Sequence, residues 1–426
     1  MARKMKDSGI EWIGEIPDGW EVLAHKYIMH KEKSICEHYN GEDIISLTLN
    51  GVVKRDLENP SGKMPTTFDG YQFVEPNDLL LCLFDIDVTP RCVGLVKDHG
   101  LTSPAYSRFK VHSGFCNSYY DYLLRFIDDE KVFVHLSKNL RSSLTESDFS
   151  AIKTVVPPKA EQQRIADYLD NGTFEINTLL SKTRSSIEEY KKLKQAVITQ
   201  AVTKGVRGER EMKDSGVEWA GLVPHHWGVA KIGSIGQTSS GATPLRSKES
   251  SFFDDATIRW VRTLDLNDGL VYDSSEKITE LALASSACSI MPKGTVCVAM
   301  YGGAGTIGKC GLLMSDCATN QAVCSIVCNR KIVSPIFLLM QLLALKSYWM
   351  KYAVGTRKDP NISQDIVARM KILIPPLNEQ KEITDYLDAK CAEIDKLIAK
   401  KEQLVKEMES YKKSLIYEVV TGKREV

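Results

Sequence analysis

The chain has 426 residues, of which 43% are hydrophobic and 26% charged, so it is too long for one compact core and has the composition of a globular protein with two or more domains. Its 55 lysine and arginine residues equal its 55 aspartate and glutamate residues in number; this neutral total argues mildly against a nucleic-acid partner, although it can hide local basic patches. No segment approaches the ~18 apolar residues of a membrane span, and the N-terminus has no apolar signal segment, so we expect a cytoplasmic protein without a membrane partner.

The eleven cysteines predict neither disulfides nor a metal site. They include no C-x-x-C pair, and the closest two, Cys324 and Cys328, lie in an alternating apolar run. In a reducing compartment such cysteines are mostly small buried hydrophobic residues. His225 and His226 stand in a proline-containing turn with no other ligands around them, so they are expected to be turn or surface residues and no zinc site is expected.

The chain begins with an eighteen-residue motif that occurs twice, which we call the opening motif. Residues 5–22, MKDSGIEWIGEIPDGWEV, recur at residues 212–229 as MKDSGVEWAGLVPHHWGV, with eleven identical positions at an offset of 207 (212 − 5). A repeat of this kind predicts two similar structural units. We expect the tryptophans of both copies to pack as shared scaffold where each unit meets a helix: Trp12, Trp20, Trp219 and Trp227.

A variable body follows each opening motif. The first body, residues 23–156, contains the strand-like runs DLLLCLFDIDV, VGLV and YSRFKV between polar loops. The second body, residues 230–374, contains TVCVAMY and AVCSIVC as strand-like runs and PIFLLMQLLALKSYWMKYA as a helical run. The two bodies share little sequence, and together they predict an α+β protein.

A second repeated segment closes each body. PPKAEQQRIADYLD from residue 157 and PPLNEQKEITDYLD from residue 375 share nine of fourteen positions at an offset of 218 (375 − 157). The proline pairs end a strand-like run and place Glu161 and Glu379 in the first turn of a helix, where a carboxylate complements the helix dipole. In the first copy, Asn171 and Gly172 predict a break or kink.

Apolar residues then recur at alternating steps of three and four in both tails, which predicts two long helices with matching seams. A helix from about Phe174 to Thr203 would run ~30 residues, or ~45 Å, which is longer than one domain needs for its own core. We therefore favour a spacer coiled coil over an ordinary amphipathic helix on each domain. The seam positions are Ile176, Leu180, Ile187, Tyr190, Val197, Ala201, Ile394, Ile398, Val405, Met408, Leu415 and Val419.

The stretch MYGGAGTIGKCG, residues 300–311, resembles a nucleotide-binding loop only superficially. Cys310 stands where a phosphate-binding loop needs Ser or Thr for magnesium, and strand-like sequence follows where a dinucleotide fold needs a helix. We therefore interpret it as a glycine-rich connection between strands. No motif of a methyltransferase, deaminase, hydrolase or nuclease stands out, so the sequence predicts no reaction that this chain would catalyse by itself.

These residues together resemble the specificity (S) subunit of Type I restriction-modification systems. The resemblance rests on both opening motifs, the IPPLNEQKEITDYLD tail, VEPNDLLLCLFDID and GLTSPAYSRFKV in the first body, and the ordered segments SSGATP, IRWVRTLDLNDG, MPKGTVCVAMYGGAGTIGKCG and TNQAVCSIV in the second. It covers nearly the whole chain. It implies an α+β fold with two strand-rich target-recognition domains joined by two long helices that form an antiparallel coiled coil, with an internal pseudo-twofold repeat.

The resemblance also implies domain boundaries and partners. The opening motif and first recognition domain would occupy residues 1–156, the first helical region 157–211, the second motif and recognition domain 212–374, and the second helical region 375–426. The partners would be double-stranded DNA, two modification subunits that hold S-adenosylmethionine, and restriction subunits that use ATP and magnesium. This chain would hold no cofactor and no metal.

Two unlike recognition domains on a stiff spacer predict an asymmetric split target, because half-sites about one DNA turn apart need ~34 Å between their centres. Changing the length of either tail helix should then change the unread spacer and neither half-site. Two alternatives stay open: a nucleotide-hydrolysing enzyme that binds ATP through Lys309, and a coiled-coil adaptor or regulatory relative without sequence preference. Because the net charge is zero, the isolated chain is expected to depend on its partners for many phosphate contacts.

The candidate DNA-binding residues are those whose side chains suit phosphates or base edges, although each could equally be a solvated surface residue. In the first body they are Lys54, Arg55, Lys63, Thr66, Thr67, Arg91, Ser103, Tyr106, Arg141 and Ser142. In the second they are Ser239, Thr243, Arg246, Lys248, Arg262, Thr306, Lys309, Arg357, Lys358 and Asn361. Asn320 and Gln321 could read adenine, but capping of a strand turn is the favoured interpretation.

Overall fold

The computed structural model describes residues 3–49, 51–60, 64–137, 142–302, 305–355 and 360–426. The chain forms two compact units. Unit 1 comprises Met1–Arg184 with Gln403–Val426, and unit 2 comprises Ser185–Glu402. Each unit therefore contains one opening motif, one body and part of each long helix.

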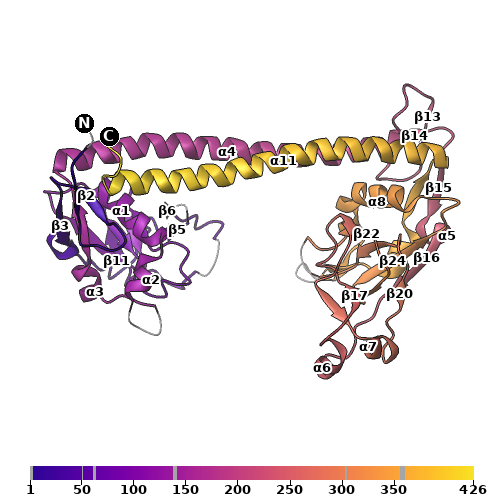
Figure 1. Ribbon diagram of the computed structural model, residues 1–426, viewed down its shortest axis with the longest axis horizontal. Helices are drawn as coiled ribbons and strands as arrows, with labels where there is room; N and C mark the ends of the chain where they lie inside the picture. Colours follow the sequence, from indigo (N-terminus) through magenta and orange to yellow (C-terminus); the bar gives the residue numbers. More distant parts are fainter. Residues whose placement is uncertain (1–2, 50, 61–63, 138–141, 303–304, 356–359) are drawn as a thin grey trace. The chain divides into compact units, whose positions relative to one another are not determined.

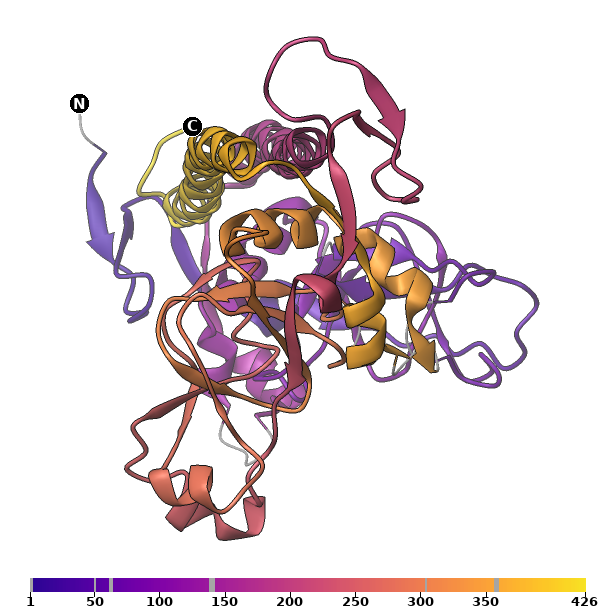
Figure 2. The same cartoon turned by 90° about the vertical axis from the view of Figure 1, so that its right-hand side faces the viewer.

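The two long helices begin where the proline pairs predict. Helix α4 spans Lys159–Lys204 and has 46 residues, and helix α11 spans Leu377–Val420 and has 44. The helices lie side by side (Figures 1 and 2). Their contacts run antiparallel within each unit, because numbers rise along one helix as they fall along the other: Asn177 with Lys412, Arg184 with Glu409, Tyr190 with Lys401, and Lys194 with Asp395.

The break expected at Asn171 and Gly172 is wrong, because α4 continues through both residues as helix. A Cβ atom added to Gly172 would lie 3.5 Å from the Leu415 Cδ2 atom on α11, so this position faces the neighbouring helix at close range. Glycine within a helix costs about 1 kcal/mol relative to alanine. Packing along the helix pair outweighs that local preference.

The predicted seam positions lie on the covered sides of the two helices. Seven of them are buried: Ile176, Leu180, Ile187, Ala201, Ile394, Leu415 and Val419. The other five are partly buried: Tyr190, Val197, Ile398, Val405 and Met408. In unit 1 several of these side chains join the core of the body itself, so the helices are part of the domain core as well as a pair.

Unit 1 has a four-stranded sheet in the order β4-β11-β8-β9, flanked by two-stranded ribbons. Its strands are β1 (Met5–Asp7), β2 (Glu15–Pro17), β3 (Glu21–Ala24), β4 (Met29–Lys31), β5 (Ile45–Thr48), β6 (Gly51–Lys54), β7 (Gln72–Val74), β8 (Leu79–Leu81), β9 (Val93–Leu95), β10 (Gly100–Thr102), β11 (Ser107–Val111) and β12 (Lys153–Val156). Its shorter helices are α1 (Asn117–Asp129), α2 (Val132–Leu136) and α3 (Glu146–Ala151). The ribbons pair β1 with β2, β3 with β12, β5 with β6, and β7 with β10.

Unit 2 has a five-stranded sheet in the order β16-β24-β21-β22-β18 and a four-stranded sheet in the order β19-β17-β23-β20. Its strands are β13 (Met212–Asp214), β14 (Leu222–Pro224), β15 (Gly228–Lys231), β16 (Gly236–Ser240), β17 (Ile258–Val261), β18 (Gly269–Val271), β19 (Glu276–Ile278), β20 (Ile290–Met291), β21 (Val296–Ala299), β22 (Cys310–Leu313), β23 (Cys317–Thr319), β24 (Val323–Cys328), β25 (Val354–Gly355), β26 (Pro360–Asn361) and β27 (Lys371–Ile374). Its helices are α5 (Ile232–Ile235), α6 (Glu249–Phe252), α7 (Glu280–Ala284), α8 (Pro335–Ala344), α9 (Trp349–Tyr352) and α10 (Gln364–Arg369). The strand-like and helical runs of the second body are confirmed.

Each body contains its own copy of the same sheet arrangement, although the sequences of the two bodies differ. β11 pairs with β8 through Ser107 and Leu81, and β24 pairs with β21 through Cys324 and Val298. The offset is the same for both partners (324 − 107 = 217 and 298 − 81 = 217). The next pair, β8 with β9 and β21 with β22, keeps that offset as well (310 − 93 = 217). The internal repeat therefore extends through the bodies in register as well as at their ends.

The cysteines are buried as predicted. Ten of the eleven side chains are buried, and Cys328 is partly exposed. Burial raises the pKa of the Cys324 thiol to about 12, so the thiol stays protonated at neutral pH. The Cys324 thiol is therefore a poor nucleophile.

His25 is a buried histidine without a hydrogen-bond partner for either ring nitrogen among the described residues. Its ring centroid lies 4.6 Å from that of Phe149, and Ile232 takes the same place in unit 2 at the repeat offset of 207 (232 − 25). Burial lowers the pKa of His25 to about 4. The folded chain therefore keeps this ring neutral where the unfolded chain would bind a proton.

Unit 1 should lose stability as the pH falls from 6.5 toward 4. Above pH 6.5 His25 is neutral in both the folded and the unfolded chain. Below pH 6.5 the unfolded chain binds a proton at His25 and the folded chain does not. The free energy of unfolding therefore falls, by about 3 kcal/mol when the pH reaches 4. Urea unfolding at a series of pH values would measure this slope, with His25→Ile as the control that should remove this contribution. An unchanged slope in His25→Ile would assign the acid sensitivity to other groups.

Candidate functional site

The candidate cations of unit 1 mostly serve the fold of the β5–β6 hairpin. The Lys54 Nζ atom lies 2.6 Å from an Asp43 carboxylate oxygen. Arg91 donates from Nε to the Leu49 carbonyl at 3.2 Å, and its other end lies 3.7 Å from Asp129 on α1. Arg91 therefore links the hairpin to α1, and Lys54 makes an ion pair next to the hairpin itself.

The remaining candidates of unit 1 are scattered over loops. Thr66 and Thr67 are exposed, Arg55 and Ser142 are partly buried, and the carbonyls of Ser103 and Tyr106 both accept hydrogen bonds from Gln72. Lys63 and Arg141 lie outside the described residues. The structure brings Ser103 and Tyr106 together in one turn, in which the Tyr106 amide donates to the Ser103 carbonyl at 3.1 Å.

In unit 2, Arg246 and Arg262 converge on one carboxylate. Arg246 donates to one oxygen of Glu276 at 2.7 Å, and Arg262 donates to the other at 2.6 Å. Arg246 also lies over the ring of Phe253 at 4.4 Å from its centroid, and both guanidinium groups lie within 6.0 Å of the Trp260 ring centroid. These contacts hold two partly exposed cations in fixed positions on the β17–β19 sheet.

The glycine-rich stretch is a connection between antiparallel strands, as predicted. It leaves β21 and returns as β22, and the described residues after Lys309 form a strand rather than a helix. Gly308 has a φ of 76°, and a Cβ atom there would fall 2.2 Å from the Trp349 ring, so only glycine fits. Thr306 is buried and donates to the Gly302 carbonyl at 3.0 Å, so it supports the turn.

Of the other candidates of unit 2, Lys309 belongs to this stretch and Asn361 lines a pocket beside it. Ser239 is partly buried on β16, Thr243 and Asn361 are exposed, and Lys309 is partly buried. A pocket of about 540 Å³ opens beside the stretch; its lining includes Ser240, Tyr301, Gly302, Asn361 and Gln364. Arg357, Lys358 and the side chain of Lys248 lie outside the described residues. The favoured interpretation of Asn320 is confirmed, because its side chain accepts a hydrogen bond from the Ala322 amide at 3.2 Å within the turn.

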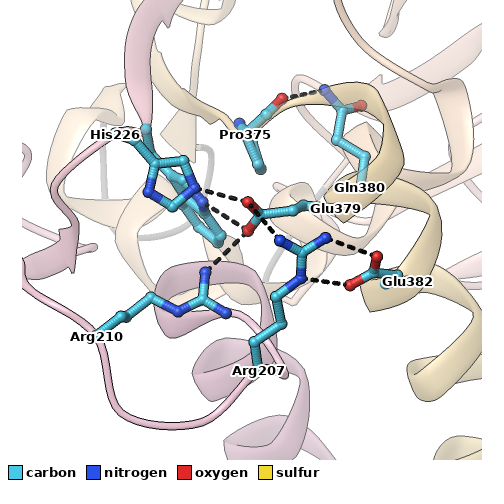
Figure 3. Close-up of polar contacts among 8 residues, drawn as sticks. Arg207, Arg210, His226, Pro375, Glu379, Gln380 and Glu382 are labelled. Carbon is cyan, nitrogen blue, oxygen red and sulfur yellow. Dashed lines mark hydrogen bonds and ion pairs between the residues drawn. The ribbon is translucent and has the colours of Figure 1, made fainter.

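Glu379 is the centre of a polar cluster that the sequence did not reveal. In Figure 3 its carboxylate faces Arg207 and Arg210, which come from the loop after α4, and His226 of the opening motif. Arg210 donates at 2.9 Å and the Nε2 atom of His226 lies at 2.6 Å. The indole N–H of Trp227 adds a hydrogen bond of 3.2 Å. The first turn of α11 is thereby tied to the opening motif and to the loop that follows α4.

Glu161 makes the equivalent cluster in unit 1. The Arg3 guanidinium lies 2.6 Å from the Glu161 carboxylate, and the Trp20 indole donates to it at 3.1 Å. Arg3 and Arg210 are related by the opening-motif offset (210 − 3 = 207), as are Trp20 and Trp227 (227 − 20 = 207). The prediction that Trp20 and Trp227 pack as scaffold is confirmed, because both are buried against the first turn of a long helix.

The neighbouring glutamines fasten each body to its helix. The side chain of Gln162 accepts from the Cys116 amide at 2.8 Å, directly before α1. The side chain of Gln380 accepts from the Ser334 amide at 2.8 Å, directly before α8. Each glutamine also donates to the carbonyl of the preceding proline pair. The two helices α1 and α8 are thus equivalent elements in bodies whose sequences differ.

The charge on Glu379 is stabilised by its partners. Burial of the side chain pushes its pKa upward, but hydrogen bonds from His226, Arg210 and Trp227 outweigh that effect, and the pKa lies below its usual value. The sequence showed only the helix-dipole role of this glutamate. The signal that could have found the cluster is the joint recurrence of Arg, Trp and Glu in both repeats.

A groove lies beside the opening motif in each unit. The unit 1 groove is about 600 Å³, and its lining includes Trp12 of the opening motif and Ser410, Lys413, Ser414 and Tyr417 of α11. The unit 2 groove is about 680 Å³, and its lining includes Trp219 of the opening motif and Lys192, Gln195, Ala196 and Thr199 of α4. The four helix positions correspond one to one at an offset of 218 (410 − 192). Figure 2 shows the β13–β14 hairpin next to the long helices.

No cluster of three or more His, Cys, Asp or Glu side chains is placed to hold a metal ion within the described ranges. Among those same residues, no helix combines the length and the apolar character needed to cross a bilayer.

The sequence is similar to known specificity subunits. The family model described as Type I restriction modification DNA specificity domain matches residues 224–407. The putative type I restriction enzyme MjaX specificity subunit of Methanocaldococcus jannaschii is 23% identical over 311 residues, which cover 71% of this chain and 67% of the relative. The EcoBI specificity subunit of Escherichia coli is 25% identical over 252 residues, which cover 57% of this chain and 52% of the relative.

Solved structures share the fold at low sequence identity. One chain, from a study of complex assembly and conformational transition of the type I R-M system, is 13% identical and covers 96% of this chain and 99% of its own length, with a TM-score of 0.73. The HsdS subunit from Thermoanaerobacter tengcongensis is 14% identical and covers 96% of this chain and 98% of its own length, with a TM-score of 0.50. The expected fold, two strand-rich domains with two long helices packed together, is confirmed.

Proposed function

Because this chain belongs to the specificity subunits of Type I restriction-modification systems and is not itself catalytic, we propose that each of its two units reads one half of a bipartite DNA site. The observation that carries the proposal is the shared register of the two central sheets beneath different surface residues. One scaffold with two unlike surfaces suits two unlike half-sites. The recognition domains would occupy residues 1–156 and 212–374, and the helical regions 157–211 and 375–426 would link them.

Mapping methylated adenines in the host genome tests this function. The chain is expressed with its genomic neighbours, and single-molecule sequencing is compared with a strain that lacks this gene. One split motif with two unlike halves, lost on deletion, is the expected result. A complex that assembles and takes up S-adenosylmethionine without any such motif would favour the adaptor alternative.

The helix pair would set the number of unread bases between the half-sites. Removing one seven-residue repeat from each helix, residues 183–189 of α4 and the facing residues 402–408 of α11, keeps the seam in phase. Seven residues span ~10.5 Å of helix, so we expect a spacer shorter by roughly three base pairs and unchanged half-sites. Methylation mapping reads both quantities at once, and a changed half-site would contradict the division of roles.

The two equivalent grooves suit two copies of one partner, which we assign as modification subunits. An arginine in the middle of a groove should block docking by bulk and charge, so Ala196→Arg and Ser414→Arg should each reduce the bound modification subunits from two to one. Native mass spectrometry of the complex measures the stoichiometry, and Ser185→Arg on α4 outside the groove is the control. Two subunits bound to both groove variants would place the docking surface elsewhere.

In this assignment the cofactors belong to the partners. The modification subunits would hold S-adenosylmethionine, and the restriction subunits would use ATP and magnesium. The proposal needs no cofactor in this chain, whose buried thiols and structural carboxylates already have roles in the fold.

A further inference from the structure

We propose that Phe84 and Tyr301 are equivalent base-contacting side chains, one in each unit, and that each contacts the 5-methyl group of a thymine in its half-site. The inference rests on the proposed function and adds a site to it. Neither residue was a candidate on sequence grounds, because single aromatic residues in strand-like runs are usually core.

The two residues occupy the same place in the shared sheet. Phe84 follows β8 and Tyr301 follows β21 at the offset of the sheet (301 − 84 = 217). The preceding residue accepts the same backbone hydrogen bond in both units, from Leu144 to Leu83 at 2.8 Å and from Ile362 to Met300 at 2.9 Å. The backbone then turns with positive φ in both units, 47° in one and 134° in the other.

Both rings are exposed at this place. The exposed fraction is 41% for Phe84 and 36% for Tyr301. Neither ring has an aromatic stacking partner among the described residues, and neither joins a hydrophobic core there. A single exposed aromatic residue needs no explanation. Two at one position of a repeated scaffold, where the surrounding sequences differ, indicate a common use.

The chemistry around the rings favours a base edge over the phosphate backbone. Asp85 and Asp87 are exposed beside Phe84 and would repel phosphates. The apolar feature that an uncharged ring can match on a base edge in the major groove is the thymine methyl group. In unit 2 the 540 Å³ pocket beside Tyr301 also carries Asn361 and Ser240. An asparagine amide suits adenine, so this pocket matches an adenine–thymine pair.

Replacing thymine by uracil in the DNA tests the inference without altering the protein. A duplex carrying the mapped site is bound to the complex of this chain with its modification subunits, with one thymine at a time replaced by uracil. We expect one position in each half-site where the loss of the methyl group weakens binding roughly fourfold. Phe84→Ala should abolish that sensitivity in one half-site only, and Tyr301→Ala in the other only.

Leu136→Ala and Leu281→Ala are the controls, since both remove a similarly exposed apolar side chain, 39% and 54% exposed, from the same two bodies. Both should keep the uracil sensitivity, and all four variants should retain their modification subunits. Sensitivity that survives in Phe84→Ala and Tyr301→Ala, or that is absent from the wild-type complex, would overturn the inference and leave the proposed function intact. A complex without any sequence preference would overturn both.

Discussion

Replacing Arg108 with methionine should destabilise unit 1 by about 3–5 kcal/mol, the usual cost of leaving one member of a buried ion pair without its partner. Arg108 on β11 and Asp78 before β8 are each 2% exposed, and the Arg108 Nε atom donates to the Asp78 carboxylate. The same carboxylate accepts the Glu75 amide at 2.7 Å. Removal of the guanidinium would therefore leave a buried negative charge at the start of β8, an inner strand of the central sheet.

Unit 2 shows that the sheet does not require this charge pair. At the offset of 217, Ser325 replaces Arg108 and Thr295 replaces Asp78, and both are buried and neutral. The Thr295 hydroxyl donates to the Pro292 carbonyl at 2.7 Å, which holds the turn that Asp78 holds in unit 1. The double variant Arg108→Met with Asp78→Asn should therefore recover most of the lost stability, because asparagine can still accept the Glu75 amide.

Hydrogen exchange measured by mass spectrometry separates the two units in one experiment. In Arg108→Met the β8 and β11 amides should exchange faster, while the β21 and β24 amides of unit 2 serve as an internal reference. Equal acceleration in both units would mean that the chain unfolds as one cooperative body. No change in β8 and β11 would show that the pair contributes nothing to stability.

The parts of the fold that could be predicted from the sequence are those with a strong local signal. The proline pairs and the three-four spacing predicted both long helices, and the alternating runs predicted β21 and β24. Helix α1 was not predicted although its sequence NSYYDYLLRFIDD is strongly amphipathic, since the buried Tyr119, Leu123 and Phe126 recur at helical spacing. The common sheet of the two bodies was equally hidden, since register depends on backbone pairing that different side chains can satisfy.

For the candidate DNA-binding residues too, the sequence predicts local properties of a side chain but not its surroundings in the fold. Lys54, Arg91 and Arg262 were predicted as DNA-binding candidates from their residue type alone. In the structure all three side chains make contacts within their own units. Sequence gives the charge of a side chain but not whether a neighbouring carboxylate already holds it. Phe84 and Tyr301 were missed for the opposite reason, because exposure of an aromatic residue depends on how the strand ends and on what covers it.

Replacing Glu379 with glutamine should destabilise unit 2 by about 3 kcal/mol, because the amide leaves Arg210 and His226 facing each other without the anion between them. The Glu379 side chain is 6% exposed, and one nitrogen of Arg210 is already buried without a hydrogen-bond partner among the described residues. Glu382→Gln is the matched control. It removes a carboxylate one turn further along α11 whose contact with Arg207 is exposed, so no measurable change is expected.

The equivalent change in unit 1, Glu161→Gln, should cost less, about 1.5 kcal/mol, because a single arginine and one indole depend on that carboxylate. Amide exchange in β15 and β27 of unit 2, compared with β3 and β12 of unit 1, measures each loss where it occurs. The pH response gives a second reading: the lowered pKa of Glu379 contributes stability above the pKa of the unfolded carboxyl, near 4.3, which is lost as the pH falls through the folded value. Glu379→Gln should remove that acid-sensitive contribution from unit 2, and an unchanged acid response would mean that ionisation of Glu379 contributes nothing to the stability of this unit.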